Sequence, residues 1–118
     1  MRAAILLVAP LAFAAACGGS GGAPSGAFEV NLTSTGVNPN SFAALSQATL
    51  HFTNNDTVSH DITSANCGEL KTGLMAAGAG ATVMLGPGPK SCNFSDSLHP
   101  TATAFQGSIS VLAPGNGY

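Results

Sequence analysis

The sequence contains very little charge. Lys, Arg, Asp and Glu together make up 7% of its 118 residues, whereas they supply about a quarter of an average soluble domain. Three basic residues and five acidic residues give a formal net charge of -2 at pH 7. Nucleic-acid binding depends on clustered lysine and arginine side chains that neutralise phosphates. The composition therefore excludes nucleic acid as a partner.

Short motifs of common catalytic sites are also missing. The chain has no glycine-lysine loop for phosphate, no H-E-x-x-H helix and no C-x2-C pair. Ser59, His60 and Asp61 are consecutive in the chain. Their side chains therefore diverge and cannot form a hydrogen-bonded catalytic triad. We do not expect an enzyme.

Long helical patterns are absent as well, since no segment keeps a helical period of apolar residues beyond one or two turns. Short segments instead alternate apolar and polar residues, which is typical of strands with one buried face. These segments are residues 28–32, 48–53, 58–62, 82–85, 91–96 and 107–112. Their regular spacing predicts an antiparallel sandwich or barrel. Residues 37–44 are compatible with a short helical turn.

An apolar run at the N-terminus has the pattern of an export signal. Residues 3–16 follow Arg2 and are too few to span a bilayer. The run ends in alanines directly before Cys17, which resembles a bacterial lipoprotein signal in which this cysteine is lipidated. The resemblance implies a signal peptide over residues 1–16 and a lipid anchor on Cys17 with a flexible Gly/Ser tether over residues 17–26. An ordinary secretory signal is the alternative.

The motifs that follow the tether resemble those of the cupredoxin family. An F-x-N-x-D motif at residues 52–56 precedes His60, and a G-x-I-x-V motif at residues 107–111 follows the loop that carries His99. The resemblance covers nearly all of residues 27–118. It implies an all-β Greek-key sandwich of about six to eight strands, in which His60 and His99 occupy the positions of the two histidine ligands to copper.

The ligand loop departs from the family pattern at its cysteine. Aligning Phe94 with the aromatic residue that precedes the ligand cysteine by two places puts Asp96 at the ligand position. Asp96 and His99 then keep the family's C-x2-H spacing, with aspartate in place of cysteine. We therefore predict that His60, His99 and Asp96 form a pale copper(II) site of the imidazole and carboxylate type, which serves copper handling rather than fast electron transfer.

An alternative alignment makes Cys92 a copper thiolate. The ligands of this blue-copper electron carrier are His60, Cys92, His99 and Gln106. This alignment leaves Cys67 as an unpaired thiol in an oxidising compartment. A disulfide between Cys67 and Cys92 uses both cysteines and closes a loop of about 25 residues, which stabilises the fold by about 3 kcal/mol. We prefer the disulfide.

A further alternative is a metal-free domain that keeps the fold and uses its loops to contact another protein. Two methionines could suggest a copper(I) site, but core packing is the preferred role for both Met75 and Met84. His51 alternates with Leu50 and Phe52 and is therefore expected to face the solvent. In each of these readings, the protein is exported to the bacterial cell envelope and contacts the membrane through its lipid anchor.

Overall fold

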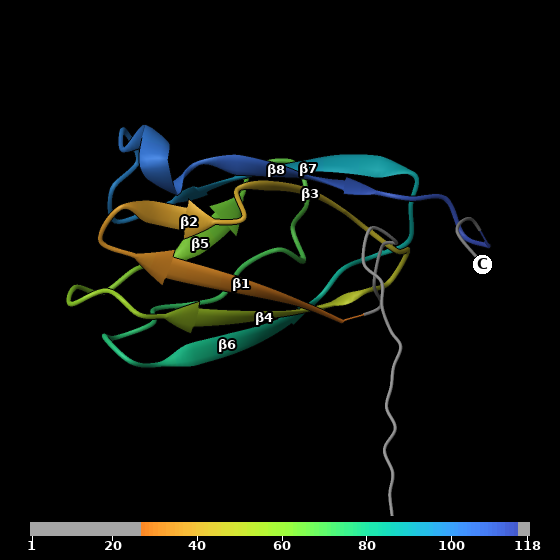
Figure 1. Ribbon diagram of the computed structural model, residues 1–118. Helices are drawn as coiled ribbons and strands as arrows, with labels where there is room; N and C mark the ends of the chain where they lie inside the picture. Colours follow the sequence, from red (N-terminus) through yellow and green to blue (C-terminus); the bar gives the residue numbers. More distant parts are fainter. Residues whose placement is uncertain (1–26, 116–118) are drawn as a thin grey trace, which may run out of the picture.

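Alternating apolar side chains give the strands one buried face, and two β-sheets pack together through these faces (Figure 1). The computed structural model describes residues 27–115. The first sheet has the order β2-β1-β4-β6 and contains β1 (Ala27–Thr33), β2 (Gly36–Asn38), β4 (Thr49–Asn54) and β6 (Gly80–Met84). The second sheet has the order β3-β8-β7-β5 and contains β3 (Ser41–Ala44), β5 (Ile62–Ser64), β7 (Lys90–Asp96) and β8 (Gly107–Val111). A short 3-10 helix, η1 (Thr103–Phe105), precedes β8.

The described residues include most of the predicted domain over residues 27–118. The predicted signal peptide (residues 1–16) and the predicted lipidated cysteine and tether (residues 17–26) lie outside them. Within residues 27–115, no helix is long and apolar enough to cross a membrane.

The predicted β-sandwich is confirmed, and residues 27–115 contain eight strands. Four strand pairs are antiparallel, but β1 pairs with β4 and β3 pairs with β8 in parallel. The sheets are therefore mixed rather than purely antiparallel. The parallel β1-β4 pair arises because the chain leaves the first sheet after β2, adds β3 to the second sheet, and returns to place β4 beside β1.

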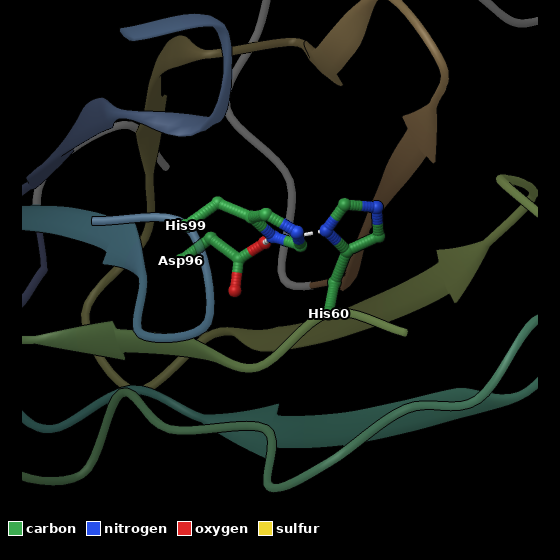
Figure 2. A group of neighbouring side chains, drawn as sticks. All are labelled: His60, Asp96 and His99. Carbon is green, nitrogen blue, oxygen red and sulfur yellow. Dashed lines mark hydrogen bonds and ion pairs between the residues drawn. The ribbon is translucent and has the colours of Figure 1, made fainter. Parts of the chain in front are cut away.

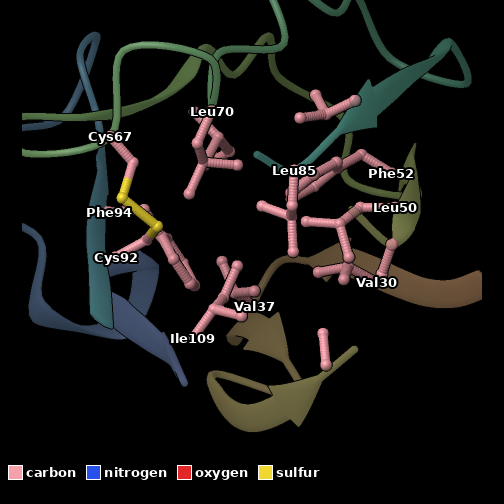
Figure 3. Close-up of a cluster of buried hydrophobic side chains, with 14 of the residues drawn as sticks. Val30, Val37, Leu50, Phe52, Cys67, Leu70, Leu85, Cys92, Phe94 and Ile109 are labelled. Atoms are coloured by element: carbon pink, nitrogen blue, oxygen red, sulfur yellow. A yellow bond between two sulfur atoms is a disulfide. The ribbon is translucent and has the colours of Figure 1, made fainter. Parts of the chain in front are cut away.

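The core lies between the two sheets and contains the Cys67–Cys92 disulfide (Figure 3). Its buried side chains include Val30, Leu50, Phe52, Ile62, Leu85, Phe94 and Ile109. The two cysteine residues are 2% and 0% exposed, and their Cα atoms are 5.5 Å apart. The predicted disulfide is therefore present, and it joins β7 to the loop that follows β5.

The two methionines differ in burial. Met75 is 1% exposed, as its predicted core position requires. Met84 is 65% exposed, so the prediction that it packs in the core is wrong. Its neighbours Val83 and Leu85 are both buried. Because adjacent residues of an extended chain point to opposite faces, Met84 is directed to the solvent.

The segment before β5 is less regular than its alternation predicts. His60 forms only an isolated antiparallel bridge with Met75, and regular pairing begins at Ile62. Val58 is 48% exposed and does not share the buried face of His60 and Ile62. The side-chain amide of Asn54 donates a hydrogen bond to the Val58 carbonyl, which holds this part of the chain in a loop.

Residues 37–44 contain strands β2 and β3 and no helical turn. Pro39 lies between the two strands. Gly36, at the start of β2, has a φ of 135°, and a Cβ atom there would lie 2.5 Å from the carbonyl oxygen of Ala104. Glycine therefore lets the β1-β2 hairpin approach η1, which belongs to the loop between β7 and β8.

Strand pairing brings the two predicted halves of the ligand site together. β5 pairs with β7 so that Ile62 lies opposite Asp96, and the segment that carries His60 therefore runs beside the end of β7. Residues 97–106 then connect β7 to β8. A Cβ atom on Gly107 would lie 2.0 Å from the carbonyl oxygen of Asn40, so glycine is required where this loop re-enters the sheet.

Candidate metal centre

His60, Asp96 and His99 form a cluster at the end of β7 (Figure 2). The Nδ1 atom of His60 lies 2.5 Å from Oδ2 of Asp96, and Nδ1 of His99 lies 2.8 Å from the same oxygen. One donor atom from each residue lies within 4.8 Å of the other two. The structure thus brings together the three residues that the sequence predicts as copper ligands.

Asp96 is fully buried, and both of its carboxylate oxygens accept hydrogen bonds. Oδ1 accepts the backbone amides of Asp61 and Leu98, each at 3.0 Å, while Oδ2 faces the two imidazole rings. Burial alone would raise the pKa of Asp96, but the hydrogen bonds from His60, His99 and the two amides outweigh it and lower the pKa below 3.8. The carboxylate is therefore held in its charged form.

His60 is 1% exposed, and each of its ring nitrogens faces a carboxylate. Nδ1 faces Asp96, and Nε2 lies 2.8 Å from Oδ2 of Asp56. Burial disfavours the imidazolium, but the hydrogen bonds to Asp96 and Asp56 outweigh burial and raise the pKa of His60 above 6.5. The ring also stacks on Phe105, with centroids 4.3 Å apart.

Asp56 is the member of the site that the sequence reasoning missed. It belongs to the F-x-N-x-D motif and lies four residues before His60, a spacing that could have suggested the contact. Asn54 of the same motif is buried, and its Oδ1 accepts the backbone amide of Asp56 at 3.0 Å. The amide group of Asn54 also donates to the carbonyls of Val58 and Met75, each at 2.9 Å. The motif therefore shapes the loop that presents Asp56 to the ring.

The site has an excess of negative charge. The three aspartates of the chain, Asp56, Asp61 and Asp96, all lie in or beside the cluster. Oδ1 of Asp61 is the one buried side-chain oxygen within residues 27–115 that has no hydrogen-bond partner. Lys90 is paired with Glu69 rather than with these carboxylates. An excess of partly buried carboxylates favours the binding of a cation.

The metal-free domain is expected to be most stable at mildly acidic pH. Stability from His60 is present below pH 6.5 and is lost as the pH rises through its raised pKa. Stability from Asp56 and Asp96 is present above pH 3.8 and is lost as the pH falls through their lowered pKa values. The free energy of unfolding in urea should therefore peak between about pH 4 and 6.5. The His60→Gln variant should flatten the decline on the alkaline side, and a wild-type stability that still rises from about pH 6 to 8 would contradict this account.

The donor set fits some metal ions and not others. Two imidazole nitrogens and one carboxylate oxygen suit borderline divalent ions such as copper(II) or zinc(II).

The alternative ligand set that includes Cys92 is wrong, because the sulfur of Cys92 is bonded to that of Cys67. The same bond removes the grouping of both cysteines with Glu69 as a metal site. Gln106, the fourth residue of that alternative, donates its side-chain amide to the carbonyl of Pro100.

The two mixed sheets have a cupredoxin-like fold, as comparison with solved structures shows. No protein-family model and no curated protein matches the sequence. The solved structures that are similar to it in fold include the following three, each at 15% identity. A variant of oxidised amicyanin matches with a TM-score of 0.63, over 75% of this chain and 84% of its own. Reduced auracyanin from Roseiflexus castenholzii has a TM-score of 0.63 over 75% of this chain and 98% of its own, and a purple cupredoxin from Nitrosopumilus maritimus has 0.60 over 71% and 98%.

Proposed function

We propose that this protein binds copper(II) through His60, His99 and Asp96 and serves copper handling rather than thiolate-based electron transfer. The observation that carries the proposal is the convergence of two imidazole nitrogens on one buried carboxylate oxygen, at 2.5 and 2.8 Å. The similarity of the fold to amicyanin, which has been solved in a Cu(I) form, supports copper as the metal. When bound, copper(II) would make the domain a carrier or store of oxidised copper.

The chemistry of the donors favours one oxidation state. Soft thiolate and thioether sulfurs select copper(I), whereas imidazole and carboxylate groups suit copper(II). Within the described residues, both cysteine sulfurs are joined in the disulfide, and Met84 is exposed on β6. The cluster should therefore hold copper(II) more tightly than copper(I), and reduction of the metal should weaken its binding.

The proposed function includes a place in the cell envelope. The apolar run over residues 3–16 and the small residues before Cys17 support export and lipidation. A lipid on Cys17 and the tether over residues 17–26 would hold the domain close to a membrane surface. The domain would then meet copper outside the cytoplasm, where the disulfide is also stable.

Titration of the purified, metal-free mature protein with Cu(II) tests the copper proposal. We expect one Cu(II) per chain, with nitrogen hyperfine structure from two imidazoles in the electron paramagnetic resonance spectrum. His60→Ala and His99→Ala should each weaken binding by more than the roughly 10–100-fold that follows loss of an outer hydrogen-bond partner. His51→Ala is the matched control, because His51 lies on β4 and contacts Thr82 rather than the cluster. Binding that is unchanged in both the His60 and His99 variants would overturn the proposal.

One observation favours a metal-free role as the second candidate. Both ring nitrogens of His60 and both oxygens of Asp96 already have hydrogen-bond partners within the chain. The cluster can therefore act as an ionic clamp between the loop before β5 and the loop after β7, in a domain that contacts another protein. A wild-type protein that takes up no Cu(II) at micromolar concentrations would leave only this candidate.

A further inference from the structure

We propose that Asp56 is a positioning residue, which holds a hydrogen on Nε2 of His60 and so directs Nδ1 toward Asp96 and His99. Its contact with Nε2 is 2.8 Å long. The part of this inference that concerns metal binding rests on the proposed function, whereas the part that concerns the ring does not. Asp56 is not one of the three residues that supply the donor atoms of the cluster.

The hydrogen bond to Asp56 fixes the orientation of the His60 ring on the side opposite Asp96. Phe105 stacks on the face of the ring and offers no hydrogen-bond acceptor. The backbone of His60 is held by paired hydrogen bonds with Met75, at 3.0 and 2.8 Å, so the side chain starts from a fixed point. A half-turn of the ring would put carbon atoms where Nδ1 and Nε2 now face Asp96 and Asp56.

Asp56 is itself held in place. Its backbone amide donates to Oδ1 of Asn54 at 3.0 Å, and its own Oδ1 accepts the amide of Thr57 at 2.6 Å. The remaining oxygen, Oδ2, is the one that faces His60. The Asp56 side chain is 8% exposed, which restricts the access of water to this contact. The carboxylate therefore presents one oxygen to Nε2 in a defined direction.

This arrangement has a chemical consequence for metal binding. A histidine can bind a metal through Nδ1 only if the hydrogen resides on Nε2, and the partner of the distal nitrogen selects this tautomer. A carboxylate partner also raises the basicity of the ligating nitrogen. Without Asp56, the ring would keep its hydrogen on Nδ1 to satisfy the buried Asp96. The nitrogen that faces the cluster would then be blocked.

Two aspartate variants with the same change in charge provide the test. Asp56→Asn should weaken Zn(II) and Cu(II) binding by about 10–100-fold and should remove or broaden the slowly exchanging Nε2-H resonance of His60 in ¹⁵N-¹H correlation spectra. Asp61→Asn is the matched control, because Asp61 follows His60 in the chain but its Oδ2 contacts Ser97 rather than the ring. It should keep the resonance and change affinity only through the loss of charge. Asp56→Ala gives a second variant if the asparagine protein does not fold.

The outcomes separate the inference from the proposed function. Loss of the resonance and of affinity in Asp56→Asn, with the resonance retained in Asp61→Asn, supports the inference. An unchanged resonance and unchanged Zn(II) affinity in both Asp56 variants would overturn the inference while leaving the copper proposal intact. If the wild type binds neither ion, the proposed function fails, and the resonance of the metal-free protein still decides whether Asp56 holds the ring.

Discussion

Asp96→Ala is expected to abolish specific Cu(II) binding and to lower the free energy of unfolding by about 3–5 kcal/mol, the usual cost of removing one member of a buried ion pair. The Asp96 side chain is fully buried and accepts hydrogen bonds from two rings and two backbone amides. Its removal leaves His60 with one carboxylate partner and leaves the amides of Asp61 and Leu98 without acceptors. Urea denaturation and Cu(II) titration of the same variant measure the two effects.

Asp96→Asn separates the charge of this residue from its shape. An asparagine oxygen can still accept a backbone amide, so the variant should be more stable than Asp96→Ala. It loses the charged oxygen that both histidines face, and its affinity for Cu(II) should therefore remain low. A variant without the carboxylate that binds Cu(II) as tightly as the wild type would show that Asp96 is not a ligand.

Replacement of both Cys67 and Cys92 by alanine is expected to lower the free energy of unfolding by about 3 kcal/mol. The disulfide spans 25 residues of sequence, and its loss restores conformational freedom to the unfolded chain. For a domain of this size, each kcal/mol shifts the midpoint of thermal unfolding by about 4–8 °C, so the midpoint should fall by about 12–24 °C. Calorimetry of the double variant measures this shift.

The same double variant tests whether the proposed copper site depends on the disulfide. A site made of His60, His99 and Asp96 does not use Cys92, so the folded variant should bind Cu(II) with an affinity close to that of the wild type below its unfolding temperature. Loss of binding in a variant that remains folded would instead show that the disulfide is needed to hold the three ligands in place.

The sequence predicted the sandwich well because alternation directly reports which side chains are buried. In β7, Cys92, Phe94 and Asp96 alternate with more exposed residues, and all three are buried on one face. The alternation also indicated β1 and β4 over nearly their full lengths. It could not indicate β2, which has three residues, too few to show a period. Nor could it give strand direction, because parallel and antiparallel strands share the same period of two.

Three residues of the site could be predicted from the sequence through family motifs rather than through alternation. His60, Asp96 and His99 were found through their order and spacing relative to family motifs, and the structure places them in one cluster. The role of Asp56 could not be found in this way, because it depends on the turn that Asn54 imposes rather than on a ligand spacing. A motif identifies residues that recur at fixed spacing in a family. Hydrogen bonds that form on folding decide which of these residues face the His60 ring.

The pairing of β3 with β8 affects when the domain can fold. Ser41 lies opposite Ser108, so the second sheet cannot be completed until the chain has been synthesised as far as β8. Pairings this distant in sequence slow folding, because a long loop must close before any contact stabilises it. A nascent chain that does not yet include β8 therefore lacks the strand that completes the sandwich. Under the proposed export, this delay would leave the chain unfolded until it reaches the compartment in which its disulfide forms.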